Sequence, residues 1–159
     1  MPFRARGFTI IEVIVAVSLL AILTTLAVPA MGGILRNSRV RSVSFDLRAA
    51  LVRARSEAIN RNTEVHVIPN GGQWSNGWTV QTAGGAQIEQ SPPLPEVTIT
   101  PAAAPTIVYR VDGRVSAGSQ RIVVSLDGSE VQPRCITLGP SGLPSTRLDR
   151  NSEASDGCS

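Results

Sequence analysis

Glu12 is the one charged residue in a long apolar segment near the start of the chain. The segment covers residues 8–28 and follows a short basic stretch that contains Arg4 and Arg6. A carboxylate in a membrane costs about 2.5 to 3.5 kcal/mol at mid-depth and less near the edge, so a positive partner is required. The residue types at this position therefore indicate ion-pair chemistry.

Groups that carry catalysis are scarce elsewhere. The sequence contains no lysine, which excludes a Walker A loop and Schiff-base chemistry, and the pair Gly84 and Gly85 has no phosphate-binding residues around it. The single histidine, His66, alternates with valines in a strand pattern, with no nucleophile motif or cluster of metal ligands near it. Ser141 does not fit the nucleophile elbow, which needs one more residue before Gly142. We expect no enzyme activity, no cofactor and no metal.

Cys135 and Cys158 are the only two cysteines. Arginines before the apolar segment favour a cytoplasmic N-terminus, and a single span then places everything after Pro29 in an oxidising space. A disulfide between the two cysteines would close a loop of about 23 residues and contribute on the order of 3 kcal/mol. We expect it to hold a C-terminal tail, residues 139–159, that is rich in Ser, Gly and charge; free thiols and an intermolecular bond remain as alternatives.

Two helical segments must position these groups. Residues 8–28, as a helix, reach about 32 Å and can cross the hydrocarbon core of a membrane. Pro29, Gly32 and Gly33 then predict a bend or a loosened turn. An amphipathic helix follows to about residue 60, because apolar residues recur three or four positions apart. This stripe, which we expect to pack on a sheet, consists of Val40, Val43, Leu47, Leu51, Ala54 and Ala58.

The opposite face of this second helical segment is rich in arginine. The chain carries 15 basic and 12 acidic residues, but seven arginines fall within residues 36–61, whereas residues 62–159 hold 6 arginines and 9 acids. The face has two interpretations, a solvated surface or a surface that meets acidic neighbouring subunits or phospholipid headgroups near residues 36–41.

Beyond residue 62 the pattern changes to short runs rich in Val, Ile and Thr between turn residues, which predicts an antiparallel sheet. Asp112-Gly113 and Asp127-Gly128 stand where two-residue hairpin turns would fall. Proline-rich residues 91–95 and 101–105 predict surface loops. The expected strands are residues 64–68, 78–82, 97–100, 106–111, 121–126 and 135–138.

The start of the chain closely resembles the leader of type IV prepilins, with basic residues, Gly7 at the cleavage point, Phe8 as the new N-terminus and Glu12 as the fifth mature residue. The resemblance implies that prepilin peptidase cuts after Gly7 and methylates the Phe8 amine. Glu12 of one subunit can then pair with the amine of its neighbour in a packed bundle, which relieves a buried charge on each.

Two other interpretations of the segment remain. A secretory signal peptide also has a basic start and an apolar core, and Val28-Pro29-Ala30 would serve as its cleavage site, but a carboxylate is a poor choice in a segment to be discarded. A plain single-span anchor explains neither Gly7-Phe8 nor Glu12.

A second resemblance covers Ala54-Arg55-Ser56-Glu57-Ala58-Ile59-Asn60-Arg61 and, after a strand, Trp74-Ser75-Asn76-Gly77-Trp78. This arrangement is similar to the GspH/FimT family of minor pilins and pseudopilins. The two tryptophans are expected to cap the sheet with large apolar area at a tight turn, with a ligand platform as the weaker alternative.

Members of the FimT/FimU branch prime type IV pili, members of the GspH branch belong to type II secretion pseudopili, and some FimT proteins bind DNA during transformation. The ending around Cys135 and Cys158 is closer to the pilus branch. The Gly-Arg-x-Arg motif of DNA-binding members is absent, since this chain reads Gly142-Leu143-Pro144-Ser145-Thr146-Arg147, and the region after the helix is net acidic. The candidate DNA contacts are Arg114, Arg121, Arg147 and Arg150.

The resemblance implies an α+β type IV pilin fold: residues 1–7 a cleaved leader, 8–29 a transmembrane and assembly helix, 30–61 an amphipathic helix and 62–159 a periplasmic β-rich head. The expected partners are other major and minor pilins, prepilin peptidase and the inner membrane. The expected function is that of a minor pilin in pilus assembly, with a GspH-type pseudopilin or a DNA-capturing pilin as alternatives.

Overall fold

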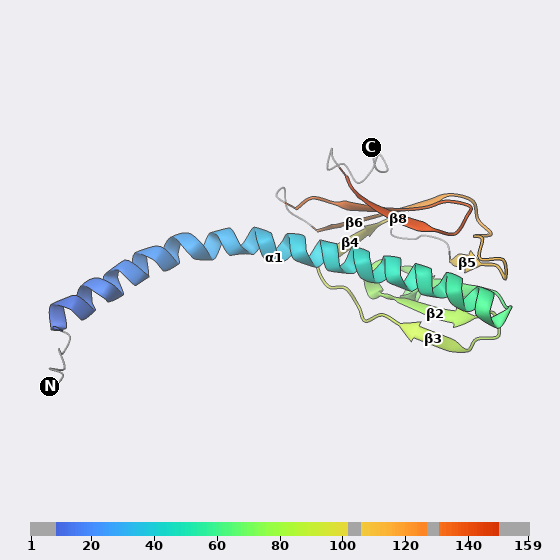
Figure 1. The fold of residues 1–159 in the computed structure, drawn as a ribbon, viewed down its shortest axis with the longest axis horizontal. Coiled ribbons are helices and arrows are strands. Elements are labelled where there is room, and N and C mark those ends of the chain that lie inside the picture. Colours follow the sequence, from blue (N-terminus) through green and yellow to red (C-terminus); the bar gives the residue numbers. More distant parts are fainter. Residues whose placement is uncertain (1–8, 102–105, 127–130, 150–159) are drawn as a thin grey trace, which may run out of the picture. The chain divides into compact units, whose positions relative to one another are not determined.

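The computed structural model describes residues 9–101, 106–126 and 131–149 of the 159-residue chain. It forms two compact units, Met1–Leu35 and Arg36–Ser159. A single 52-residue helix, α1 (Ile10–Arg61), supplies the first described part of each unit (Figure 1). The backbone of α1 is helical through Pro29, Gly32 and Gly33, so the loosening expected at these residues does not interrupt the helix. An interior proline removes one backbone donor from a helix, but here the helical backbone continues on both sides of it.

The part of α1 in the second unit buries the stripe that the apolar spacing predicts. All six predicted stripe residues are buried, and Ala50 and Ser44 extend the buried face. The Ser44 hydroxyl donates to the Val40 carbonyl at 2.7 Å, so this buried polar group is satisfied within the helix. The prediction of an amphipathic helix packed against strands is confirmed.

One four-stranded antiparallel sheet has the strand order β3-β2-β1-β5. Two short 3₁₀ helices, η1 (Asn70–Gly72) and η2 (Trp74–Asn76), join its two central strands. Alternate residues of these central strands are buried, as expected for strands with one face on the core. The strands are β1 (Val65–Pro69), β2 (Trp78–Thr82), β3 (Gln87–Gln90) and β5 (Ile107–Tyr109).

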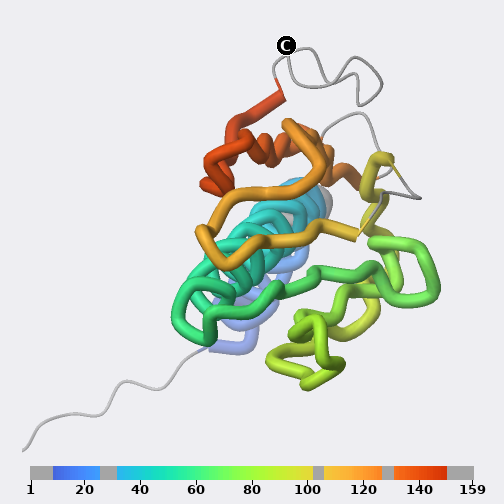
Figure 2. The backbone as a smooth tube through the Cα atoms, turned by 90° about the vertical axis from the view of Figure 1, so that its right-hand side faces the viewer, coloured from blue at the N-terminus to red at the C-terminus, as the bar shows by residue number. Residues whose placement is uncertain are grey.

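A second four-stranded antiparallel sheet has the order β4-β6-β7-β8. Figures 1 and 2 show the two sheets on opposite sides of the core, with β1 to β3 in green on one side and β6 to β8 in orange and red on the other. Buried side chains from α1 and both sheets form one hydrophobic cluster. The strands are β4 (Val97–Thr100), β6 (Gln120–Leu126), β7 (Arg134–Leu138) and β8 (Pro144–Leu148).

The sequence-based account of the strands was incomplete in two places. We expected one sheet and six strands, but β3 and β8 were missed and the strands divide into two sheets. The residues of β3 are polar and partly or fully exposed, and β8 begins with a proline, so neither has the apolar composition of a buried strand. Both lie at sheet edges, where pairing with one neighbour maintains the strand.

The turn at Asp112-Gly113 also differs from the prediction. The Gly113 N–H donates to the Arg110 carbonyl at 2.8 Å, and Tyr109 pairs with Val115, so the loop is longer than two residues. Among the described residues only Asn62 and Glu96 are non-glycine residues with positive φ, so Asp112 does not adopt the conformation expected of it, whereas Gly113 has φ +74°. This is the pattern of a hairpin that closes on a glycine in the left-handed region. Asp127-Gly128 lies outside the described residues.

Candidate functional site

The start of α1, which carries the expected assembly residue Glu12, has a helix cap that the sequence analysis did not predict. The Glu12 N–H donates to the Thr9 hydroxyl at 3.3 Å, and α1 starts directly after Thr9. Thr-x-x-Glu is a known helix-start pattern, in which the threonine side chain satisfies a backbone donor of the first turn. The three-residue spacing of Thr9 and Glu12 in the sequence could have indicated this cap. Gly7 and Phe8, the expected processing residues, lie outside the described residues.

The Glu12 carboxylate therefore has a second physical role beside ion pairing. As the acidic residue of the first turn, it interacts favourably with the helix dipole. Its side chain is exposed, and no ion pair involves it within the described part of the chain. The capping bond uses its backbone N–H, so the carboxylate itself stays available to another chain.

The first turns of α1 expose apolar side chains on every side. The large apolar residues from Ile10, which is 81% exposed, to Leu23 are all exposed. The hydroxyls of Ser18, Thr24 and Thr25 donate to helix carbonyls at 2.7 to 2.9 Å, so they need no outside partner. Over the described residues, the structure has no helix whose length and apolar character would let it cross a membrane.

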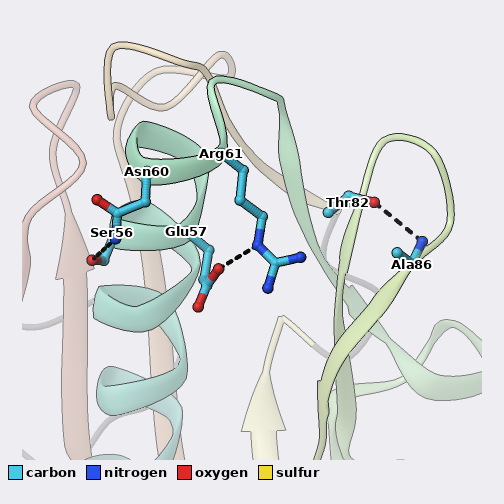
Figure 3. A network of polar contacts seen from close by, with 6 residues as sticks. All are labelled: Ser56, Glu57, Asn60, Arg61, Thr82 and Ala86. Carbon is cyan, nitrogen blue, oxygen red and sulfur yellow. Dashed lines mark hydrogen bonds and ion pairs between the residues drawn. The ribbon is translucent and has the colours of Figure 1, made fainter.

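The arginines of α1 in the second unit have different partners. Arg53 Nη1 lies 3.5 Å from Glu89 Oε2 on β3, and Arg61 pairs with Glu57 one turn earlier (Figure 3). Arg48 Nε donates to the Pro144 carbonyl at 3.4 Å, and Arg55 Nε donates to the Gly113 carbonyl at 3.1 Å. Some arginines therefore tie α1 to β8 and to the β5 hairpin, rather than forming a purely solvated face.

A small buried cluster fixes the end of α1 against the two sheets. The Tyr109 hydroxyl donates to the Gly142 carbonyl at 3.2 Å. Burial raises the pKa of Tyr109 well above its usual 10.0, while the positive charge of Arg55 opposes the shift. Gly142 has φ +77°, and a Cβ there would lie 2.1 Å from the Gly113 carbonyl oxygen. The backbones of the β5 hairpin and the segment before β8 thus approach too closely for any side chain at residue 142.

The two tryptophans belong to the core. Trp74 and Trp78 are 0% and 1% exposed, and both belong to the main cluster. Gly77 between them has φ +83°, and a Cβ there would lie 2.5 Å from the Pro92 carbonyl oxygen. The motif is therefore explained as a tight turn that inserts two large side chains beneath the loop before β4, with glycine required by the approach of that loop. This is the structural role that we favoured over a ligand platform.

Cys135 is disulfide-bonded and fully buried. Its expected partner, Cys158, lies outside the described residues, so the pairing remains a prediction. In the strand register Cys135 pairs with Val123 on β6 and with Arg147 on β8, so these three side chains share one face of the sheet. Val123 is also buried, although it does not belong to the main core cluster.

The four candidate DNA contacts do not all lie on one surface. Arg121 and Arg147 are exposed and lie on the same face of the β4-β6-β7-β8 sheet, two strands apart, because both pair in register with β7. Arg114 lies instead in the hairpin after β5, where its carbonyl accepts from the Arg110 N–H at 2.9 Å. Arg150 lies outside the described residues.

The single histidine shows no catalytic arrangement. His66 lies on the central strand β1, with Nε2 3.9 Å from a Glu64 carboxylate oxygen and without a hydrogen bond. Within the residues that the structure describes, no group of three His, Cys, Asp or Glu side chains is placed to hold a metal.

Comparisons with known proteins fit this geometry. Residues 2–28 match the prokaryotic N-terminal methylation motif, which belongs to membrane-anchored, pilin-type chains, and residues 45–142, more than half of the chain, match the family described as type II transport protein GspH. A search of curated proteins found no match.

Two crystal forms of the type IV minor pilin FimU of Pseudomonas aeruginosa share the fold. One is 18% identical with a TM-score of 0.61, over 77% of this chain and 96% of the FimU chain. The other is 19% identical with a TM-score of 0.59, over 75% and 99%. The predicted type IV pilin fold is confirmed. The chain belongs to the GspH family of pilin-type proteins.

Proposed function

We propose that this protein is a minor pilin of a type IV pilus that takes part in pilus assembly and priming. The observation that carries the proposal is one segment with three properties: a pilin-type methylation motif, apolar side chains exposed all round a helix, and a single carboxylate in the first turn, where the residue's backbone N–H is capped by Thr9. A helix that is apolar on every side needs lipid or other helices around it. A precursor in the inner membrane, and later a filament, would supply both in turn.

The mechanism is assembly rather than catalysis. Prepilin peptidase would cut after Gly7 and methylate the amine of Phe8. Residues 8–29 would anchor the precursor with its head in the periplasm, and would then bundle with the helices of other pilins. Glu12 would meet the Phe8 amine of a neighbour, since an uncompensated carboxylate in such a bundle is costly. The head would contact other minor pilins without acting as an enzyme.

A deletion in the natural host tests this function. Loss of the gene is expected to reduce the number of surface pili, with secretion through the type II system unchanged, and the tagged protein should appear in sheared pili. Intact mass measurement of that protein should show the chain without residues 1–7 and with one added methyl group. Normal piliation and absence from the sheared fraction would refute the proposal.

The leading alternative is a GspH-type pseudopilin of a type II secretion system, which the description of the matched family favours. The same deletion separates the two functions. A secretion defect with normal pili identifies the pseudopilin, and neighbouring secretion genes rather than pilus genes would agree with it.

DNA capture is the third function, and of its four candidate contacts Arg121 and Arg147 share a sheet face. Two arginines neutralise few phosphates, and binding strength grows with the number neutralised. Retention of DNA by the protein in a gel-shift assay at low salt, together with a transformation defect in piliated cells, would support DNA capture. Absence of retention would exclude DNA capture.

A further inference from the structure

An open groove of about 440 Å³ lies beside the edge strand β4. Its walls come from β4, from η2 and from the proline-rich segment before β4, and the residues that line it include Ser75, Asn76, Val97 and Ile99. Among the described residues none from β6, the strand that pairs with β4, lines the groove. The groove therefore lies along the outer edge of β4 rather than over a face of the sheet.

The backbone of β4 directs hydrogen-bonding groups toward this groove. The Val97 N–H donates to the Leu94 carbonyl at 3.3 Å, so it points away from β6. Residues two apart in an antiparallel strand direct their backbone groups to the same side, so the N–H and C=O of Ile99 also point away from β6. The Thr98 carbonyl, in contrast, accepts from the Ser125 hydroxyl of β6 at 3.3 Å. Because Ile99 is only 2% exposed and buried backbone groups need partners, an incoming chain would satisfy them.

The strand β4 lacks the features that protect the other edge strands from pairing. Charged residues, prolines and irregular pairing are common means by which proteins block a sheet edge. The pairing of β3 is irregular and β3 carries Glu89, whereas β8 begins with Pro144 and carries Arg147. On β5, Tyr109 pairs with Val115 as well as with β1. The four residues of β4 are valine, isoleucine and two threonines in regular register, so this edge remains suited to another strand.

The charge of the groove indicates what kind of segment it takes. Glu96 is the one charged residue among those that line the groove, and it is exposed. Within the described part of the chain its carboxylate forms no ion pair. Its backbone has φ +71°, a strained conformation for a residue other than glycine. An acidic groove favours a partner with a basic residue and disfavours DNA or an anionic lipid headgroup.

We propose that this groove binds an extended segment of a different pilin-type subunit, which adds to the β4-β6-β7-β8 sheet beside β4 and places a Lys or Arg side chain against Glu96. Strand addition takes its affinity from main-chain hydrogen bonds and its selectivity from side-chain contacts. A helix does not fit, because its backbone groups bond within the helix and cannot pair with Ile99. The proposal names a partner for the assembly function proposed above and rests on it.

Site-specific crosslinking in the natural host tests the groove. A photoreactive benzoylphenylalanine at Asn76, an exposed residue of the groove wall, is placed in the full chain. We expect an adduct with another pilin-type subunit, which mass spectrometry maps to an extended segment close to a Lys or Arg. The same group at Gln87, an exposed residue of the edge strand β3, is the control position. An adduct with lipid, with a second copy or within the same chain, or a yield no higher than at Gln87, would overturn the proposal.

Charge reversal at the groove tests the role of the carboxylate. Glu96→Lys should reduce the Asn76 adduct about fivefold or more, because like charges across an interface oppose binding. Glu64→Lys, the same change at an exposed residue that does not line the groove, is the matched control and should leave the yield unchanged. Equal loss in both variants would contradict the role of Glu96.

Glu96→Gly separates binding from folding. Glycine adopts a positive φ without strain, so this variant should be at least as stable as the wild type and should still lose most of the adduct. Urea unfolding measures the first quantity and the crosslinking yield the second. A wild-type yield would show that the carboxylate does not hold the partner.

Amide hydrogen exchange tests the strand pairing itself. The purified full chain in detergent micelles is mixed with a synthetic peptide that has the sequence of the crosslinked segment, and NMR follows single amides. Exchange at Ile99 should slow about tenfold or more with the peptide, because its N–H becomes bonded. The Thr98 amide, which faces β6, should not change. Unchanged exchange at Ile99 would refute strand addition.

The sheared pilus fraction of the same strains keeps this proposal apart from the proposed function. If the protein is present in filaments and the Asn76 adduct is missing, the groove proposal is wrong while the pilin function stands. If the protein is absent from filaments, the proposed function itself fails.

Discussion

Glu12 combines a local and an intermolecular role in one residue. Its backbone N–H completes the cap with Thr9, and its carboxylate lies in the first turn, where the helix dipole favours negative charge. These local effects are worth about 0.3 to 1 kcal/mol for an exposed charge. Loss of one member of a buried ion pair costs roughly 3 to 5 kcal/mol, so the two roles differ enough in size to be separated.

Glu12→Gln removes the charge and keeps the backbone N–H and the size of the side chain. We expect normal accumulation of the precursor and a strong loss from filaments, because the neighbouring amine would be left uncompensated. Immunoblots of membranes and sheared pili measure both quantities. Thr9→Ala is the control, which costs about 1 kcal/mol of helix stability and should leave incorporation intact. Wild-type incorporation of Glu12→Gln would refute the pairing.

Tyr109 is the only tyrosine of the chain, so its phenolate absorbance reports one site. Because burial raises its pKa above 10.0, the folded protein should not ionise near pH 10, whereas the denatured chain should. The unfolded state then loses a proton that the folded state retains, so this contribution is fully present below about pH 10 and falls as pH rises further.

The matching stability measurement uses Tyr109→Phe. Denaturant midpoints of the wild type should fall between about pH 9 and about pH 11, and the variant should show less of this decline. The variant also loses the hydrogen bond to Gly142, which costs about 1 kcal/mol at neutral pH. Ionisation of the folded protein at the same pH as the denatured chain would contradict the prediction.

At the scale of elements, α1 and the sheets are held together by close backbone approaches that permit no side chain. The carbonyl oxygen of Gly113 accepts from Arg55 on α1, and it lies only 2.1 Å from the position that a Cβ of Gly142 would take. The obstacle is backbone rather than a flexible side chain, so it cannot move without shifting the hairpin away from the helix.

Gly142→Ala is expected to destabilise the head by at least about 2 kcal/mol, through the strain of a positive φ together with the clash. Gly85→Ala is the matched control, because Gly85 has φ +83° but nothing within 4 Å of its Cβ position, and it should lose about 1 kcal/mol. Urea unfolding followed by tryptophan fluorescence compares the two variants. Equal losses would show that the close approach to Gly113 contributes nothing.

The strands differ in whether their own amino-acid composition predicts them. The predicted bounds of β2 and β4 agree with the structure, because apolar β-branched or aromatic residues alternate with polar ones there. The edge strands β3 and β8 could not be found this way, since they are exposed and are maintained by the neighbours with which they pair. Their signal lies in the pairing and not in their own residues.

At the scale of the whole molecule, the second sheet carries Cys135, which is disulfide-bonded. Cys135 and Val123 are buried on the sheet face opposite the core cluster. That Cys158 is the disulfide partner stays a prediction, and the loop that this bond would close is worth about 3 kcal/mol.

Cys158→Ser is expected to lower the free energy of unfolding by about 3 kcal/mol and to leave one reactive thiol at Cys135. Chemical denaturation measures the first effect and alkylation under non-reducing conditions the second. The double variant Cys135→Ser/Cys158→Ser should be about as unstable as the single one. A disulfide-linked dimer of the wild type would instead identify the intermolecular bond.

Several features of this protein can be predicted from its sequence. The apolar segment with its single carboxylate, the leader around Gly7 and Phe8, and the stripe from Val40 to Ala58 are local patterns, and their period and charge determine the helix and the family. These features depend on neighbours three or four residues away, so the linear order is enough to detect them.

Only the tertiary structure decided what depends on residues far apart in the chain. It separated the strands into two sheets, brought Gly113 against Gly142, and directed Arg48 and Arg55 to backbone carbonyls but Arg53 to the Glu89 carboxylate. The physical reason is that burial and pairing are properties of contacts. The spacing of apolar residues along a helix is visible in the sequence, but whether a row of them faces the core or solvent depends on what the rest of the fold covers.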